Sequence, residues 1–361
     1  MKSVIYIPGA PHRQQVAPLK KMGVAVVGYG FMGGVHLKAW TMIPEAKIVA
    51  IVGLRINKAR AVARKFKAKA YANLEQAVKE ADIDVVDICT PTYTHKQIVM
   101  NALKARKQVL VEKPLALSLK DADQMIGAAR KAGVKFMVAH CVRFFAEYAR
   151  IKELVSQGAI GEPVISRGHR AGPLPTWGRR SWFSNPKLSG GVGIDLAIHD
   201  IDFTRWCFDD KVKDVYAKVD RLVHKRGICD DHALIIMRFE RDGIAHIEAS
   251  WAVPSQYPFT TYFEIAGRKG FISVDNLSVT PVTVMSNGKI ERSSPETYAP
   301  VPGTPFPIDP YYREIRHFAD CVINGTEPMT DGKEARKSLE IALAAIRSSK
   351  TGDVIKLPLE G

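Results

Sequence analysis

The chain has 361 residues, of which 46% are hydrophobic and 25% are charged, as in globular proteins of one to three domains. No apolar run approaches the ~18–20 residues of a membrane-spanning helix, so we expect no membrane partner. The formal net charge is +15, but no basic cluster is interleaved with aromatic residues. We therefore expect no nucleic-acid partner and interpret the charge as that of a basic enzyme suited to an anionic cofactor or substrate.

Residues 1–21 differ in character from the rest of the chain. The apolar stretch 4–7 is too short for a signal peptide, and Pro8 and Pro11 follow it closely. Because Met22 directly precedes the first strongly apolar segment, we expect the working domain to begin there. Residues 1–21 would then be a leader, either disordered or an artefact of the chosen start.

The segment 24–33 contains the strongest motif in the chain. Residues 24–27 predict a buried strand, the next six match G-x-G-x-x-G, and 34–43 predict a helix. This is the context of a dinucleotide-binding site, in which the glycines allow a tight turn and a close approach of the backbone to a pyrophosphate. The residues predicted to contact the cofactor here are Gly28, Tyr29, Gly30, Phe31, Met32 and Gly33.

Strands and helices then alternate up to about residue 142. The expected strands are 47–53, 84–89, 108–111 and 135–139, and the expected helices are 57–66, a helix ending near 104, and 118–133. Ser118 is the expected N-cap of the last of these helices, with Asp121 completing an imperfect capping box. This alternation predicts an α/β fold with a doubly wound parallel sheet, formed by residues 22–142.

The pattern changes after residue 142. Helices are expected at 143–157, 194–208, 311–324 and 333–348, and a Gly/Pro-rich stretch at 168–193. Between 212 and 290 the chain reads as short alternating strands, which predict a largely antiparallel sheet. Residues 143–361 are therefore expected to form a second, α+β domain.

The end of the second strand bears on cofactor choice. An acid that binds the ribose 2′-hydroxyl is expected ~20 residues after the glycines. That place holds Gly53 and Leu54, followed by Arg55, so no carboxylate is available and a guanidinium could bind a 2′-phosphate. We therefore predict NADP rather than NAD. The alternative is that Arg55 is an ordinary surface residue and that water holds the ribose.

Two further motifs supply candidate chemistry. Glu112-Lys113-Pro114 ends an apolar strand, at the edge where doubly wound sheets bind ligands, although Lys113 could simply reach solvent. Asp195 and His199 are four residues apart on the helix expected at 194–208, and a His beside a carboxylate suits proton transfer near neutral pH. The alternative is a structural Asp–His pair on a surface helix.

Five cysteines stand at 89, 141, 207, 229 and 321, and none forms a C-x-x-C pair. The sequence thus contains no zinc or redox motif, and we predict no metal site. Cys89 lies in an apolar strand and is expected to be a small buried thiol. We interpret the chain as a reduced, cytoplasmic protein.

Together these stretches resemble the glucose–fructose oxidoreductase, inositol dehydrogenase and rhizopine-catabolism family, Gfo/Idh/MocA, from about residue 24 to 357. Besides the glycine fingerprint, the resemblance rests on Cys89-Thr90-Pro91, Glu112 to Ala116, Val138 to His140 with Arg143-Phe144, Gly190 to Asp200, and Tyr311 to Ile315 with Phe318. It implies a Rossmann domain followed by an α/β domain whose open sheet forms the contact of a homodimer or homotetramer. The chain differs from the family pattern in having no acidic residue at the end of the second strand, and this difference argues against the use of NAD.

The resemblance also implies an activity: hydride transfer between nicotinamide and a hydroxyl or carbonyl carbon of a sugar, cyclitol or nucleotide sugar. Lys113, Asp195 and His199 match the catalytic positions. His199 would take the hydroxyl proton, Lys113 would hydrogen-bond the oxygen or relay the proton, and Asp195 would orient the substrate. Further cofactor contacts are implied at Arg55, Thr90, Pro91, His95, Glu112 and Lys113.

The substrate contacts are expected in the variable segment 169–188 and next to it. Aromatic side chains there could stack on a sugar and arginines could hold a phosphate. The candidates are His140, Arg143, Arg170 and Trp182. The alternative is a surface loop with a buried Trp. Two other functions also fit the fold: a non-catalytic NAD(P)-binding sensor, and a redox-neutral NAD-dependent glycoside hydrolase.

Overall fold

The computed structural model describes residues 20–176, 179–225, 227–295 and 309–359. Most of the leader expected at 1–21 lies outside this range, and the first strand, β1, begins at Met22. Within the described residues, no helix combines the length and the apolar character needed to cross a membrane.

The N-terminal half forms a six-stranded parallel sheet in the order β3-β2-β1-β4-β5-β6. Its strands are β1 (Met22–Val27), β2 (Ala46–Val52), β3 (Lys69–Tyr71), β4 (Val85–Ile88), β5 (Gln108–Glu112) and β6 (Phe136–Ala139). The helices between them are α1 (Phe31–Thr41), α2 (Ile56–Lys65), α3 (Leu74–Glu80), α4 (His95–Lys104) and α5 (Leu119–Ala132). All six residues of β1 are buried, as expected for a strand covered by helices on both faces. The predicted doubly wound sheet is confirmed.

The C-terminal half is built on a nine-stranded sheet in the order β14-β13-β12-β11-β7-β10-β9-β8-β15. Its strands are β7 (Pro163–Ala171), β8 (Val212–Asp220), β9 (His232–Phe239), β10 (Ile244–Ser250), β11 (Thr260–Gly267), β12 (Gly270–Asp275), β13 (Val282–Ser286), β14 (Lys289–Ser293) and β15 (Ile355–Lys356). Only β7 and β10 pair in parallel, so the predicted, largely antiparallel sheet is confirmed.

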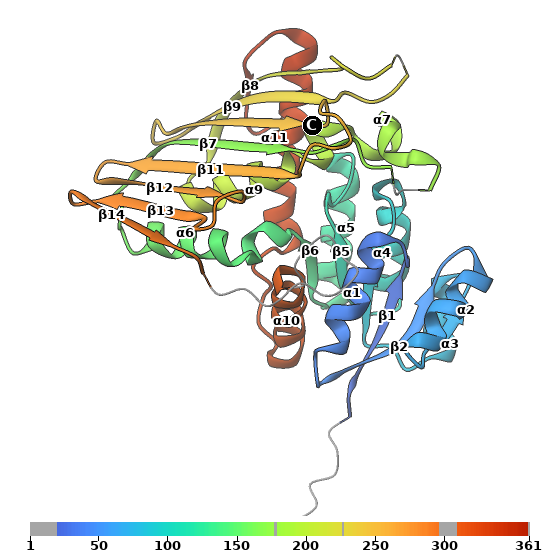
Figure 1. Cartoon of the computed structure of the whole chain (residues 1–361). Coiled ribbons are helices and arrows are strands. Elements are labelled where there is room, and N and C mark those ends of the chain that lie inside the picture. The colour runs from blue at the N-terminus through green and yellow to red at the C-terminus, as the bar shows by residue number, and fades with distance from the viewer. Residues whose placement is uncertain (1–19, 177–178, 226, 296–308, 360–361) are drawn as a thin grey trace, which may run out of the picture.

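Helices cover one face of this large sheet (Figure 1). The helices of this half are α6 (Ala146–Ser156), α7 (Pro186–Ser189), α8 (Val192–Asp195), α9 (Ile198–Phe208), α10 (Asp309–Asn324) and α11 (Gly332–Thr351). From Ala233 onward, residues along β9 alternate between buried and exposed, because one face of the strand packs toward α8 and the other is open. Short 3₁₀ turns lie at Thr92–Thr94, Cys141–Phe144 and Arg179–Ser184.

The last two long helices return to the N-terminal sheet. Ile315 and Phe318 of α10 share one hydrophobic cluster with Leu37 and Trp40 of α1. The helix α11 packs against α5 and β6 as well as against β8. Both ends of the chain therefore contribute to the packing of the two halves against each other.

Three expected elements have different bounds. The helix predicted at 194–208 is two helices, α8 and α9, separated at residues 196–197. The helix predicted at 143–157 divides into a 3₁₀ turn and α6. The start of the stretch predicted as a Gly/Pro-rich loop belongs to β7, where Gly168 lets α9 pack closely: a Cβ there would lie 3.3 Å from Cβ of Asp200.

The predicted N-cap of α5 can be tested by mutation. The Ser118 side chain accepts a hydrogen bond from the backbone N–H of Asp121 at 3.2 Å. Ser118→Ala should lower the free energy of unfolding by about 1 kcal/mol, because that N–H loses its partner. Urea denaturation measures the change, with exposed Lys120→Ala as the control, expected within about 0.5 kcal/mol of wild type. Equal stability of Ser118→Ala and wild type would contradict the cap.

Candidate active site and cofactor cradle

The three fingerprint glycines form a cradle at the end of β1. A Cβ on Gly28, whose φ is +93°, would lie 2.6 Å from the carbonyl oxygen of Cys89. A Cβ on Gly33 would lie 2.1 Å from the carbonyl oxygen of Gly28, so helix and turn meet through their backbones. Among the described residues, no atom lies within 4 Å of a Cβ built on Gly30, the N-cap of α1, and no side-chain hydrogen bond caps this helix. The residues therefore fit a dinucleotide pyrophosphate at an open helix N-terminus.

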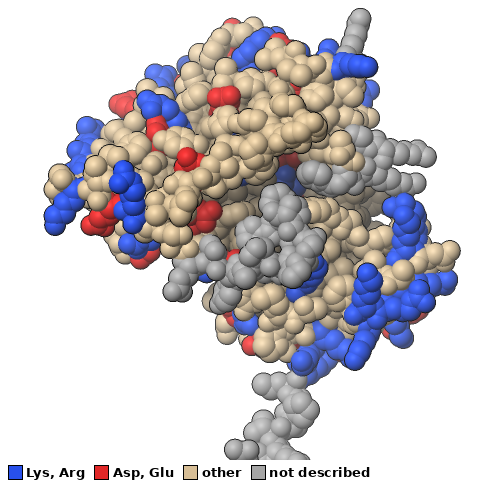
Figure 2. Space-filling model, in the orientation of Figure 1, with Lys and Arg blue, Asp and Glu red and all other residues tan. Residues whose placement is uncertain are grey.

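The surface next to this cradle is strongly basic. Arg55 is exposed at the N-cap of α2, directly after Gly53 and Leu54. The ten residues of α2 contain no acidic side chain and four basic ones: Lys58, Arg60, Arg64 and Lys65. In Figure 2, Lys and Arg side chains gather over this part of the molecule. An anion bound at the start of α2 would therefore meet a positive field.

Lys113 joins the two halves of the chain at the carboxyl edge of the parallel sheet. Its Nζ donates a hydrogen bond to the carbonyl oxygen of Asp195 at 2.7 Å and lies 3.3 Å from Oδ1 of the same residue. Only 15% of the Lys113 side chain and 8% of the Asp195 side chain are exposed. Burial raises the pKa of Asp195, and the Lys113 ammonium opposes that rise. Two residues predicted to act together are thus in direct contact.

The interruption between α8 and α9 makes this contact possible. In an unbroken helix, the carbonyl oxygen of Asp195 would accept the backbone N–H of His199. Here the N–H of His199 bonds instead to the carbonyl oxygen of Leu196 at 3.3 Å. The carbonyl of Asp195 is left for Lys113. The expectation that Asp195 and His199 share one helix face was therefore wrong.

His199 lies in the first turn of α9 and is partly buried. Its Nδ1 is buried and has no hydrogen-bond partner among the described residues. Burial, reinforced by the positive charges of Lys113 and Arg170, holds the pKa of His199 well below its usual value. The ring is therefore neutral at pH 7 and can accept a proton.

Glu112 belongs to a buried polar cluster with His36 and Asp87, which the sequence analysis did not predict. Nδ1 of His36 lies 2.9 Å from Oδ2 of Asp87, and Nε2 of His36 lies 3.2 Å from Oε1 of Glu112. Burial opposes the charged imidazole, yet the charge of Asp87 holds the pKa of His36 well above its usual value. The indole N–H of Trp40 also donates to Asp87, at 2.8 Å. The available signal was Asp87 itself, because a carboxylate inside an apolar strand needs buried partners.

This cluster also has the composition of a metal site. Ligand-type atoms of His36, Asp87 and Cys89 lie within 4.8 Å of one another. However, Asp87 already faces His36, the indole N–H of Trp40 and the thiol of Cys89. Burial raises the pKa of the Cys89 thiol, which keeps it protonated. The arrangement is thus that of a hydrogen-bonded cluster.

The other predicted cofactor residues border the cradle. Thr90 and Pro91 follow β4, and Glu112 accepts the backbone N–H of Lys113 at 3.0 Å. The ring nitrogens of His95 lie 2.9 Å from the carbonyl oxygen of Thr90 and 3.0 Å from that of Pro114. His95 therefore ties the turn after β4 to the turn after β5, and this geometry gives it a positioning role.

The two candidate substrate arginines are engaged in buried ion pairs. Arg143 makes two hydrogen bonds to Asp202, at 2.7 and 2.8 Å, and is 2% exposed. Arg170 binds Asp200 in the same way, at 2.7 and 3.0 Å. The charge of Arg170 nevertheless acts on His199, whereas Arg143 lies against Trp206 in the core.

The remaining candidates, His140 and Trp182, have different surroundings. Neither ring nitrogen of His140 has a hydrogen-bond partner among the described residues, and burial lowers its pKa. The positive charge of Lys113 also lowers the pKa of His140. Trp182 is partly buried and lies against Phe183, with ring centroids 4.0 Å apart and the two ring planes tilted by 30°. Residues 177–178 of the same segment lie outside the described residues.

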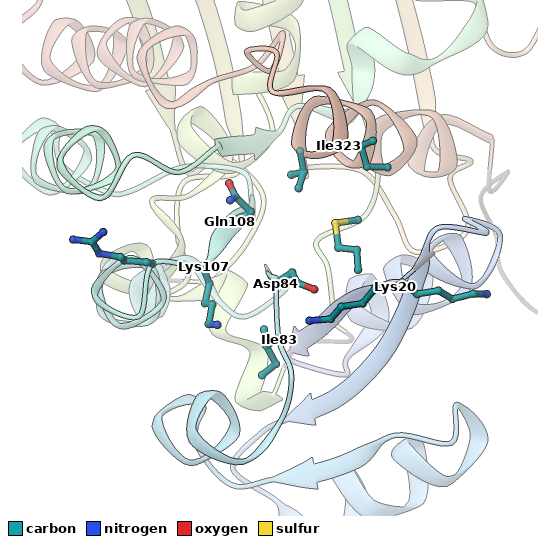
Figure 3. A pocket seen from close by; sticks show the side chains of 10 residues that line it. Lys20, Ile83, Asp84, Lys107, Gln108 and Ile323 are labelled. Atoms are coloured by element: carbon teal, nitrogen blue, oxygen red, sulfur yellow. The ribbon is translucent and has the colours of Figure 1, made fainter. Parts of the chain in front are cut away.

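A well-formed pocket lies elsewhere, beside the start of β1, and is shown in Figure 3. It has a volume of about 380 Å³, and its lining includes Lys20, Asp84, Lys107, Gln108 and Ile323. Lys20, Asp84 and Lys107 stand where β1, β4 and β5 begin, and Ile323 lies at the end of α10. Doubly wound sheets bind ligands instead where their strands end. The glycine cradle and Lys113 lie at that other edge, so we place the candidate site there.

Two family models match the chain. One, described as an oxidoreductase family with an NAD-binding Rossmann fold, matches residues 22–140. The other, the GFO/IDH/MocA C-terminal domain, matches residues 148–273.

Similar proteins cover nearly the whole chain. The myo-inositol 2-dehydrogenase of Thermotoga maritima is 30% identical over 93% of this chain and 98% of its own length. The scyllo-inositol 2-dehydrogenase (NAD(+)) of Bacillus subtilis is also 30% identical, over 93% and 96%. Among solved structures, GenD2 from gentamicin A biosynthesis, in complex with NAD, is 26% identical with a TM-score of 0.82, covering 98% of this chain and 100% of that one.

The depressed pKa of His199 predicts a pH dependence of stability. In the unfolded chain a histidine has a pKa of ~6.5, whereas the pKa of His199 in the folded chain is well below that value. Below pH ~6.5, the unfolded chain therefore binds a proton at this residue that the folded chain does not bind. The free energy of unfolding that depends on a neutral His199 is therefore fully present above pH ~6.5 and is lost as the pH falls below that value. Relative to His199→Gln, wild type should lose up to ~1.4 kcal/mol of unfolding free energy per pH unit below ~6.5. Urea denaturation at several pH values measures this, and parallel curves would contradict it.

Proposed function

The chain belongs to the Gfo/Idh/MocA family of oxidoreductases, and from that premise we propose that it is an NAD(P)-dependent dehydrogenase of sugars or cyclitols. The observation that carries the proposal is the convergence of Lys113, Asp195 and the neutral His199 at the sheet edge that bears the glycine cradle. When bound, the nicotinamide supplies the hydride acceptor, or the hydride donor in the reverse direction.

The residues of this chain would handle the substrate hydroxyl. His199 takes the hydroxyl proton as the C–H bond breaks, because its imidazole is neutral. The Lys113 ammonium, fixed by Asp195, donates a hydrogen bond to the same oxygen and stabilises its developing negative charge. The Asp195 carboxylate orients Lys113 and a neighbouring hydroxyl of the substrate.

The substrate class is a polyhydroxylated ring, either a sugar or a cyclitol. Two of the relatives are named as inositol dehydrogenases, and the site described here offers buried polar groups suited to several hydroxyls. Those groups include His140, Asp195 and the Arg170–Asp200 pair. The partly buried Trp182, which lies beside Phe183, supports a contact with the apolar face of a sugar.

We favour NADP over NAD as the cofactor. This preference rests on the absence of a carboxylate at 53–55 and on the wholly basic charge of α2, whereas relatives are named with NAD. We also propose that the chain forms a homodimer or homotetramer through the open face of the large sheet. Exposed apolar side chains stand on that face, including Tyr216, Leu234 and Ile236.

The activity can be tested on the purified protein. NADP⁺ and NAD⁺ are each combined with a panel of inositols, sugars and nucleotide sugars, and formation of reduced nicotinamide is followed by absorbance. We expect the nicotinamide cofactor to be reduced when one class of polyol is present. His199→Ala should then lower turnover by ~10²-fold or more, because the proton acceptor is lost, while cofactor binding persists.

The control is Lys104→Ala, which removes an exposed side chain from the last residue of α4. Its turnover should stay within about twofold of wild type. Full activity of His199→Ala would refute the assigned base. Tight cofactor binding without reduction on any member of the panel would instead favour the sensor or the redox-neutral hydrolase.

The cofactor preference has its own test. Arg55→Ala should weaken NADPH binding by about tenfold and leave NADH within about threefold, because only the former carries a phosphate for the guanidinium. Fluorescence titration of each cofactor gives the dissociation constants. Arg64→Ala, which removes the same charge from the last turn of α2, is the control. Equal affinity of wild type for NADPH and NADH would refute the preference.

A further inference from the structure

The aromatic side chain inside the glycine fingerprint packs across the end of the second strand. A Cβ built on Gly53 would lie 2.3 Å from Cε1, 3.0 Å from Cδ1 and 3.2 Å from Cζ of Tyr29. Real Cβ atoms do not approach other heavy atoms within 3.0 Å. The Tyr29 ring therefore fills the space into which any side chain at residue 53 would point.

The ring is also held in place. Its hydroxyl donates a hydrogen bond to the carbonyl oxygen of Arg55 at 2.9 Å. The strands beneath it are fixed too, because Gly28 donates to Val52 at 2.9 Å and Gly53 donates to the carbonyl oxygen of Tyr71 at 3.0 Å. Moving Tyr29 off Gly53 would break its hydrogen bond to Arg55 at the N-cap of α2.

We propose that Tyr29 is the specificity-determining residue of the cofactor site, because its ring occupies the position of the ribose-binding carboxylate that selects NAD. This inference rests on the proposed function. The fold places that acid at the end of the second strand, where the chain has Gly53. Tyr29 excludes an acid sterically, and through the Arg55 carbonyl it fixes the start of α2. Cofactor selection thus depends on the Tyr29–Gly53 pair as well as on the charge of Arg55.

Neighbouring residues do not share this constraint. Leu54 is 83% exposed, so a carboxylate placed there would meet no aromatic ring. Arg55 is exposed as well, and it touches Tyr29 through its backbone. The Tyr29 ring therefore limits which side chain can occupy residue 53, but it does not limit residues 54 and 55.

A double-mutant cycle tests the coupling. Dissociation constants for NADPH and NADH are measured by fluorescence titration for wild type, Gly53→Asp, Tyr29→Ala and the double variant. Gly53→Asp alone should weaken both cofactors by about tenfold, because the ring is displaced and its hydrogen bond is lost. The double variant should recover NADH binding but not NADPH binding, so that the preference inverts. The two effects on NADH should deviate from additivity by at least about threefold.

The control is Leu54→Asp, which should change the dissociation constants of the two cofactors by the same factor whether residue 29 is Tyr or Ala. Thermal melts monitor folding, and Gly53→Ala replaces Gly53→Asp if the latter does not fold, because a Cβ alone meets the ring. Additive effects, or inversion by Gly53→Asp alone, would overturn the proposal. If wild type prefers NADH, the proposed cofactor choice fails, while the additivity measured with NADH still decides the role of Tyr29.

Discussion

The hydrogen bond from the Lys113 ammonium to the main chain of Asp195 is the contact on which the candidate site depends. A largely buried ammonium needs acceptors, and an unbroken helix would offer none, because its carbonyls are already bonded. The chain interrupts the helix at residues 196–197, which frees one carbonyl for Lys113. The same interruption starts α9 anew at Ile198, so His199 stands in a first helical turn beside this contact. Local backbone geometry and catalytic chemistry are therefore set together.

That contact crosses between the two halves of the chain, while a buried polar cluster within the C-terminal half ties α9 and α11 to the turn that holds Arg143. Asp202 of α9 accepts two hydrogen bonds from Arg143 and one from Ser338 of α11, at 2.9 Å. Removing one partner of such a buried pair leaves an uncompensated charge, which costs about 3–5 kcal/mol. Since α10 packs on α1 and α11 on α5, helices from both ends of the sequence fix how the two halves pack against each other.

The sequence was sufficient for features that depend on neighbours along the chain. The glycine fingerprint, the Ser118 cap and the placement of Lys113 at a strand end follow from local pattern, and the fold confirms the first two. The break after Asp195 could not be predicted, because the competing donor, Lys113, lies 82 residues away. The contact of the Tyr29 ring with Gly53 could not be predicted either. It links the ends of two strands through a side chain whose direction does not follow from any sequence periodicity.

The charges beneath the site explain why α10 can close on α1. Asp87 and Glu112 face the charged His36, and a further carboxylate there would be uncompensated. Burial, reinforced by the charge of Glu112, raises the pKa of Glu314 well above its usual value, so this residue of α10 enters as a neutral acid. The helix thus brings a polar group but no additional charge to the cluster.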